Sequence, residues 1–213
     1  MRPIKIGPLL PITALTTAFN AQTFNSTGAA TAPTTTATTD GLAHQVTLVA
    51  PVQATLAGVT FTIVGTGPDG NTQTETGLVG PASGATVTST KYFKTVATIQ
   101  PSATMGALVV SVGIAAPSLT QTLPLEYRSI VGAQHDVDIT GTINYTMQET
   151  LDNVFDTTIT PDFGSYTSAF SAKTATVVGQ GLVGAFGARV LINTVTNGAT
   201  LTWRVNQPTQ ITG

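Results

Sequence analysis

The chain has 213 residues, of which 41 % are apolar and 8 % are charged, and its formal net charge is −2. This length allows one large or two small domains, each with a buried core. Sparse Lys and Arg and a pI near 5.5 argue against a general nucleic-acid-binding protein. The sequence has no apolar run long enough for a transmembrane helix, and it has no cysteine for disulfides, metal ligation or nucleophilic catalysis.

Threonine, which occurs 43 times, takes the place of the missing charged residues. Its branched Cβ suits the pleated surface of a β-sheet. A surface rich in threonine is wettable but repels neighbouring molecules little. This composition therefore favours close association with other copies or other subunits.

Residues 1–39 predict an extended N-terminal arm, because prolines recur along it and residues 31–39 (TAPTTTATT) are of low complexity. The prolines also interrupt the apolar opening residues, so we expect no signal peptide. Two interpretations remain open: a partly ordered terminus, or an extension that docks on another subunit. The second interpretation gives six candidate assembly contacts, namely Arg2, Ile4, Lys5, Ile6, Leu9 and Leu10.

Residues 40–116 predict a first β-sandwich or barrel domain. Apolar residues alternate over 44–49, 59–63, 92–99 and 106–113, and the turn sequences GPDGN (67–71) and GPASG (80–84) separate strand-like runs. The stretch 59–99 predicts a β-meander of sequential antiparallel strands. No helical periodicity of useful length interrupts it.

Residues 117–124 predict a linker, and residues 125–213 a second domain of the same class. Alternating segments cover 137–148, 187–193 and 199–205, and Asn197-Gly198 predicts a type I′ hairpin turn. The predicted fold is therefore all-β, with two small antiparallel sandwich or barrel domains in tandem behind the arm.

Two groups of residues are candidates for chemistry. His135, Asp136 and Asp138 place a histidine and two same-face carboxylates on one predicted strand, which is either solvated or part of a metal site. Glu149, Asp152, Asp156 and Asp162 lie in an irregular section that also carries aromatic residues such as Phe155 and Tyr166. These carboxylates suggest a glycosidase pair or, more simply, a loop that meets a basic partner or stays in water.

Two further features have plain structural interpretations. Gly179–Gly184 (GQGLVG) imitates a phosphate-binding loop but lacks the strand–helix context, so it predicts a turn or bulge. Trp203 alternates with Arg204, which predicts a core tryptophan beside an outward arginine; the alternative is an exposed ligand platform.

Several sequence segments together resemble a known protein family. The segments GVTFTIVGTGPDGN (58–71), Glu75, Gly80-Pro81 and TVTSTKYFKTV (86–96), followed by GTINYT (141–146) and GATLTWRV (198–205), resemble two-domain β proteins among the structural proteins of tailed bacteriophages. The resemblance covers roughly residues 40–206. It implies a virion component of the decoration or head–tail type, with no catalytic residues to carry over.

The sequence thus predicts a non-enzymatic phage structural protein, most simply a capsid decoration or cement protein that binds the shell through its arm and β surfaces. We expect no cofactor and no catalytic or metal-ligating residues. The expected partners are other copies in a trimer or larger homo-oligomer and the major capsid or tail proteins, without nucleic acid or membrane. Rival interpretations are a tail or collar component, a receptor- or carbohydrate-binding module, and a glycan-degrading enzyme that uses Glu149 and the nearby aspartates.

Overall fold

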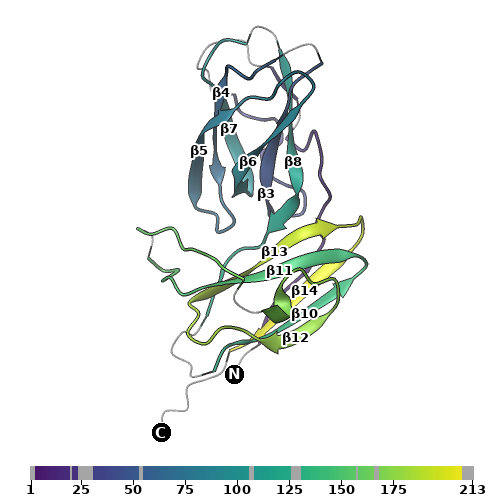
Figure 1. Cartoon of the computed structure of the whole chain (residues 1–213), viewed down its shortest axis with the longest axis vertical. Coiled ribbons are helices and arrows are strands. Elements are labelled where there is room, and N and C mark those ends of the chain that lie inside the picture. The colour runs from purple at the N-terminus through teal and green to yellow at the C-terminus, as the bar shows by residue number, and fades with distance from the viewer. Residues whose placement is uncertain are drawn as a thin grey trace. The chain divides into compact units, whose positions relative to one another are not determined.

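The computed structural model describes residues 3–19, 21–23, 31–52, 55–105, 108–125, 131–156, 158–165 and 168–207. These residues form antiparallel β-sheets together with one short 3₁₀ helix, η1 (Ser168–Phe170), which confirms the predicted all-β class (Figure 1). Among the described residues, no helix is long and apolar enough to cross a membrane.

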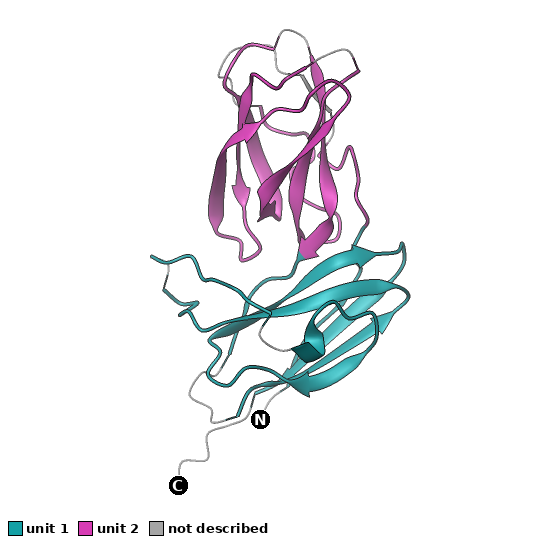
Figure 2. Ribbon diagram, in the orientation of Figure 1, with its two compact units in different colours: residues 1–12, 119–213 teal, residues 13–118 magenta. Residues whose placement is uncertain are grey.

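The chain divides into two compact units (Figure 2). Unit 2 contains residues 13–118, whereas unit 1 combines residues 1–12 with residues 119–213. The predicted tandem order is therefore not confirmed, because the N-terminal residues belong with the C-terminal half.

Unit 2 contains two antiparallel sheets, with strand orders β5-β4-β7 and β8-β3-β6, and a short strand β2 pairs with β8. Its strands are β2 (Ala21–Thr23), β3 (Ala43–Val49), β4 (Thr60–Thr66), β5 (Thr72–Val79), β6 (Thr86–Phe93), β7 (Thr95–Pro101) and β8 (Val109–Leu119).

The predicted meander over residues 59–99 is wrong in its pairing. β4 pairs with both β5 and β7, but β6 pairs with β3 in the other sheet. The chain therefore changes sheets after β5 and again at Lys94, between β6 and β7. Alternation of apolar residues reports which side of a strand is buried, but not which strand lies beside it.

The predicted turns in unit 2 are confirmed as reversals. In the β4–β5 hairpin the amide of Gly70 donates to the carbonyl of Gly67 (3.0 Å), and Gly70 has a φ of 80°. Before β6, the amide of Ala85 donates to the carbonyl of Ala82 (2.9 Å). Glycine supplies the left-handed backbone conformation that such reversals require.

Unit 1 contains a sheet of strand order β1-β14-β10-β12 and a second group in which β13 pairs with β11 and with short β9. Its strands are β1 (Ile4–Leu9), β9 (Leu123–Pro124), β10 (Gln134–Thr140), β11 (Ile143–Thr150), β12 (Val177–Gln180), β13 (Gly187–Val195) and β14 (Thr200–Asn206). Side chains at alternate positions of these strands, such as Leu201, Trp203 and Val205, are fully buried in the core.

Two predicted segments are built differently. β1 lies within the predicted arm, and strands β8 and β9 occupy much of the predicted linker 117–124. Asn197-Gly198 forms a turn, but it connects strands of different sheets, and only Gly198 has a positive φ (79°). The prediction of a type I′ hairpin is therefore wrong, since that turn needs two positive φ angles.

Candidate functional site

His135 lies in the core of unit 1, and its side chain is fully buried. Its Nδ1 accepts a hydrogen bond from Nε1 of Trp203 (3.2 Å), and its ring meets the Phe170 ring edge to face. Because an indole nitrogen only donates, the neutral imidazole carries its proton on Nε2. That nitrogen lies 3.5 Å from Oε1 of Glu149, which is too long for an ordinary hydrogen bond, so Nε2 is buried without a hydrogen-bond partner.

Glu149 is also buried, in β11, with 2 % of its side chain exposed. Its Oε1 accepts a hydrogen bond from the amide of Leu182 (2.9 Å), and a Cβ on Gly181 would lie 2.1 Å from that oxygen and 2.6 Å from Nε2 of His135. Gly181 is therefore the residue that lets the backbone cover this pair. The predicted turn over residues 179–184 is confirmed only in its second half, because Gly179 and Gln180 belong to β12, whereas Gly184 has a φ of 78°.

Asp136 and Asp138 point away from this core, as their alternation with His135 predicts. Nη1 of Arg204 donates to Oδ2 of Asp136 (2.7 Å) and to Oδ2 of Asp138. All three side chains are partly exposed, and the hydrogen bonds to Asp138 and Asp136 raise the pKa of Arg204. The prediction of an outward Arg204 beside a core Trp203 is confirmed, and full burial rules out Trp203 as an exposed platform.

In the irregular section that follows Glu149, the carboxylates of Asp152 and Asp156 have separate partners. Oδ2 of Asp152 accepts a hydrogen bond from the amide of Asp162 (2.6 Å). Oδ1 of Asp156 accepts from the hydroxyl (2.6 Å) and the amide (2.9 Å) of Thr158, and these bonds lower the pKa of Asp156. These residues fix the loop, whereas Glu149 is buried beside His135.

The aromatic residues of this section are also divided. Phe155 is 66 % exposed, whereas the guanidinium of Arg189 lies 3.8 Å above the ring centroid of Phe163. Tyr166, the other predicted sugar platform, lies outside the described residues.

The candidate assembly contacts at the N-terminus fall on β1. Ile4, Lys5, Ile6 and Leu9 pair in register with β14, and Leu10 follows with 59 % of its surface exposed. Arg2 lies outside the described residues. This part of the arm docks on its own chain because its apolar residues extend the β1-β14-β10-β12 sheet. The break at Gly7-Pro8, where the register shifts, hides the strand pattern in the sequence.

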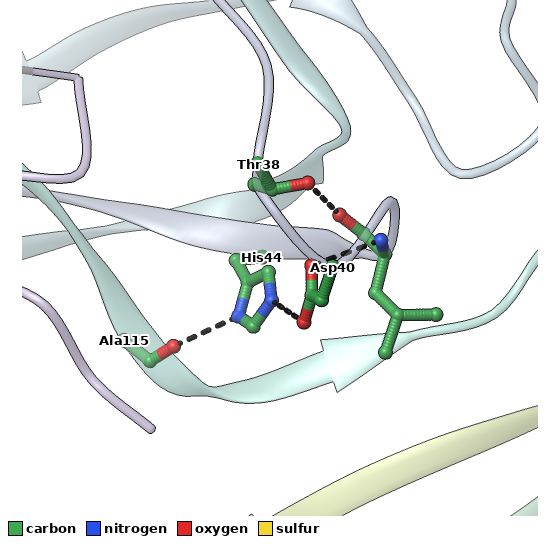
Figure 3. Close-up of polar contacts among 5 residues, drawn as sticks. Thr38, Asp40, His44 and Ala115 are labelled. Carbon is green, nitrogen blue, oxygen red and sulfur yellow. Dashed lines mark hydrogen bonds and ion pairs between the residues drawn. The ribbon is translucent and has the colours of Figure 1, made fainter. Parts of the chain in front are cut away.

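A second buried histidine, His44, fixes the start of β3 in unit 2 (Figure 3). Its Nδ1 lies 3.1 Å from the carbonyl oxygen of Ala115, and its Nε2 lies 2.9 Å from Oδ2 of Asp40. Asp40 also accepts from the amide of Leu42 (3.0 Å), and the hydroxyl of Thr38 donates to the carbonyl of Leu42 (2.6 Å). Nothing in the sequence signals either partner of His44, because an i, i+4 spacing brings side chains together in a helix and residues 40–44 form a turn that leads into a strand.

Glu75 holds two strands of different sheets together in unit 2. Its Oε1 and Oε2 accept hydrogen bonds from the amides of Thr90 (2.9 Å) and Lys91 (2.8 Å) in β6. In the opposite direction, Nζ of Lys91 donates to the carbonyl of Thr74 (2.6 Å) in β5. In the sequence, Glu75 stands out only as part of the family resemblance, which implies no role for it. The only indication of this role in the sequence is a lone carboxylate at an inward-facing position of a polar strand.

Among the residues described, no group of three or more His, Asp or Glu side chains is arranged to hold a metal ion. No family model, curated protein or solved structure matches the chain.

Proposed function

We propose that the chain is a non-enzymatic structural subunit of a tailed-phage virion, and that it decorates or cements the capsid shell. The observation that carries this proposal is the pairing of a charge-poor all-β surface with large exposed apolar side chains. Charged residues make up 8 % of the chain. Exposed apolar residues on the described surface include Leu10, Val52, Val79, Leu151, Phe155, Val178 and Val183, each more than half exposed.

Such a surface favours burial against neighbouring protein. Single exposed apolar residues are ordinary on any protein, but here few charged side chains surround them to oppose contact. Each contact is weak by itself, and symmetric copies on a particle convert weak contacts into strong attachment. The partners in this proposal are other copies, in a trimer or larger homo-oligomer, and the major capsid protein. The chain is assembled onto the virion in the host cytoplasm.

The buried polar groups support a structural role. His44 and Asp40, His135 and Glu149, and Glu75 each join segments that are distant in the sequence or lie in different sheets. The polar atoms of His44, Asp40 and Glu75 are committed to hydrogen bonds that fix the fold. A tail or collar component is the nearest alternative within the same class, since the same surface suits either position.

The test is a phage whose gene for this chain carries an early stop codon. We expect its particles to assemble with filled heads and complete tails, but to lose DNA at lower temperature than wild-type particles, and added purified chain to restore the wild-type threshold. Heads without tails would assign the chain to the tail or collar. Particles of normal composition and stability, with no copy of the chain in wild-type virions by mass spectrometry, would contradict the proposal.

A further inference from the structure

The turn between β13 and β14 contains Asn197-Gly198, a dipeptide whose chemistry plays no part in the proposed function. Thr196, Asn197 and Gly198 are all exposed, and Gly198 has a φ of 79°. A Cβ added to Gly198 would meet no described atom within 4 Å. Water therefore reaches this dipeptide, and its backbone has room to rotate.

An asparagine that precedes a glycine can react with its own backbone. Once hydroxide has removed its proton, the amide nitrogen of Gly198 can attack Cγ of Asn197, because glycine has no side chain to crowd the nitrogen or restrict the rotation. A bond forms between that nitrogen and Cγ, and the bond between Cγ and Nδ2 breaks. Nδ2 leaves as ammonia with a proton taken from water, and the product is a five-membered succinimide ring.

Water then opens the succinimide in one of two ways. Addition at Cγ breaks the new bond to the Gly198 nitrogen and gives an ordinary aspartate. Addition at the main-chain carbonyl carbon of residue 197 breaks the original peptide bond and gives an isoaspartate, in which the backbone runs through Cγ. In sum, one amide and one water become one carboxylic acid and one ammonia, so the chain gains a negative charge without any oxidant or reductant.

The fold leaves the attacking nitrogen of Gly198 available. The hydrogen bond that closes the turn runs from the amide of Ala199 to the carbonyl of Thr196 (3.1 Å). Within the part of the chain that the structure describes, no acceptor holds the Gly198 amide. An amide without an acceptor exchanges its proton with water more readily than one held in a hydrogen bond.

Two aspartate–glycine pairs of unit 2, which can form the same ring, are protected by comparison. In Asp40-Gly41, the glycine amide donates to the carbonyl of Thr38 (3.4 Å), and the aspartate side chain is fully buried. In Asp69-Gly70, the glycine amide donates to the carbonyl of Gly67 (3.0 Å). The fold thus occupies the nucleophile at both of these sites and leaves it open at Asn197-Gly198.

Asn193 is the comparison for an asparagine side chain in the same segment. Its Nδ2 donates to Oδ1 of Asn144 (2.7 Å) and to Oγ1 of Thr146 (3.2 Å). The next residue is Thr194, whose branched side chain restricts the backbone and crowds its amide nitrogen. Asn193 should therefore stay intact under conditions in which Asn197 reacts.

We propose that Asn197 is a site of spontaneous deamidation and isoaspartate formation, with the Gly198 amide nitrogen as the nucleophile and water as the co-reactant. The reaction needs no partner, so it is independent of the proposed function. An isoaspartate lengthens the backbone of a turn that connects strands of different sheets. The next residue, Ala199, is buried with its Cβ close to Gly141, so the longer turn should loosen the start of β14.

The test is peptide mapping of the purified full chain during incubation in mildly alkaline buffer made with heavy-oxygen water. Trypsin cuts after Arg189 and Arg204 and releases residues 190–204, which contain both Asn193 and Asn197. We expect Asn197 to convert about tenfold or more faster than Asn193, because only Asn197 precedes a glycine. Each product should carry one heavy oxygen atom, and an isoaspartate-specific methyltransferase should label part of it.

Three variants identify the reacting groups. Asn197→Gln keeps the amide but needs a larger ring, and Gly198→Ala crowds the nucleophile, so each should remove most of the conversion at position 197. Asn71→Gln, the same substitution at an exposed asparagine that precedes a threonine, is the control and should leave conversion of Asn197 unchanged. Asn197→Gln retains the turn glycine, so its result does not depend on whether Gly198→Ala folds.

Urea unfolding followed by Trp203 fluorescence measures the consequence for β14. The isoaspartate form, separated by its charge, should unfold at a lower urea concentration than the variant Asn197→Asp, which has the same charge and the ordinary backbone. Equal unfolding of the two forms would refute the loosening of β14.

Three results would overturn the assignment of the site: an unmodified Asn197 in the folded chain, equal conversion of Asn193, or undiminished conversion at position 197 in Asn197→Gln. Conversion that occurs only in urea-unfolded chain would also contradict it, because the folded turn would then protect the amide.

Discussion

At the scale of single residues, the contacts of His44 determine where its protons lie. The carbonyl of Ala115 can only accept, so Nδ1 of His44 carries a proton. A second proton lies between Nε2 and Oδ2 of Asp40, which are 2.9 Å apart, and both side chains are fully buried. The pair therefore shares a buried proton whose loss leaves one partner unsatisfied.

Substituting Asp40 tests this arrangement. Asp40→Ala removes the acceptor and should lower the free energy of unfolding by about 3 to 5 kcal/mol. Asp40→Asn should cost only about 1 kcal/mol, because its amide can donate to Nε2 of a neutral ring and its oxygen can still accept from Leu42. Urea unfolding followed by circular dichroism measures both values. Equal losses for the two variants would contradict the proton assignment.

The raised pKa of Tyr145 predicts how the stability of the protein changes at alkaline pH. Its side chain is fully buried, its hydroxyl donates to the carbonyl of Ala175 (3.1 Å), and burial, followed by the charge of Asp136, raises its pKa from 10.0 to about 12. Between pH 10 and 12 the unfolded chain loses this proton and the folded chain keeps it. The free energy of unfolding therefore falls as pH rises through this range, by up to about 2 to 3 kcal/mol.

Tyr145→Phe removes this contribution. The variant should be less stable than wild type at pH 8, because it loses a hydrogen bond, and the difference should shrink as pH rises from 10 to 12. Urea unfolding at several pH values measures the difference. A constant difference across this range would show that the Tyr145 pKa is not raised.

Substituting Gly181 tests how closely the backbone at this residue packs over His135 and Glu149. The methyl group of Gly181→Ala would clash with both side chains, so we expect a loss of about 1 to 3 kcal/mol in the unfolding free energy. Fluorescence of Trp203, the only tryptophan, reports this unit directly. Gly58→Ala, whose added methyl meets no described atom within 4 Å, is the matched control. Similar stability of the two variants would contradict the close packing at Gly181.

At the scale of elements, Glu75 connects two strands that do not pair as neighbours in a sheet. Glu75→Ala should speed hydrogen exchange at the amides of Thr90 and Lys91 by about tenfold or more, because both lose a charged acceptor. Thr76→Ala, exposed on the same strand, is the control. Nuclear magnetic resonance measures these rates one amide at a time. Unchanged exchange at both amides would mean that Glu75 does not hold β6.

The strands were largely predictable because burial on one side imposes alternation, as in β4 and β14. Their partners were not predictable, because alternation in β6 reads the same whether the strand pairs with β3 or with β5. β1 and β12 escaped detection for a local reason: Gly7-Pro8 interrupts the first, and β12 has only four residues. The turn glycines were recognised, but their turn types depend on which sheet the next strand enters.

The candidate sites were predictable only where the partners are close in sequence. The shared face of Asp136 and Asp138 follows from the two-residue period of a strand. The contacts of His135 with Trp203 and Glu149, which are far apart in the chain, do not follow from any local pattern. The exposed side chains of the acidic loop were likewise visible only in the fold, because Phe155 is as apolar as the core residue Phe170.

At the scale of the whole molecule, the N-terminal residues contribute to both compact units. Residues 4–9 form β1 in unit 1, and Phe19 is fully buried in unit 2. The N-terminal segment is therefore part of the folded units and is not a removable tether.

Deletion of residues 1–38 tests this organisation. It should lower the melting temperature by several degrees or more, because it removes a sheet strand and a core phenylalanine. Thr17→Ala, at an exposed residue of the same segment, is the control and should leave the melting temperature unchanged. Calorimetry measures both, and a fully stable 39–213 fragment would show that the segment is only an appendage.

The central claim is that the chain is a repeated structural subunit of a tailed-phage particle. A reconstruction of the intact virion by electron cryomicroscopy tests it most directly. We predict density for many symmetric copies on the outer surface of the capsid. A virion map fully accounted for by other proteins, with no density that fits either unit, would contradict it.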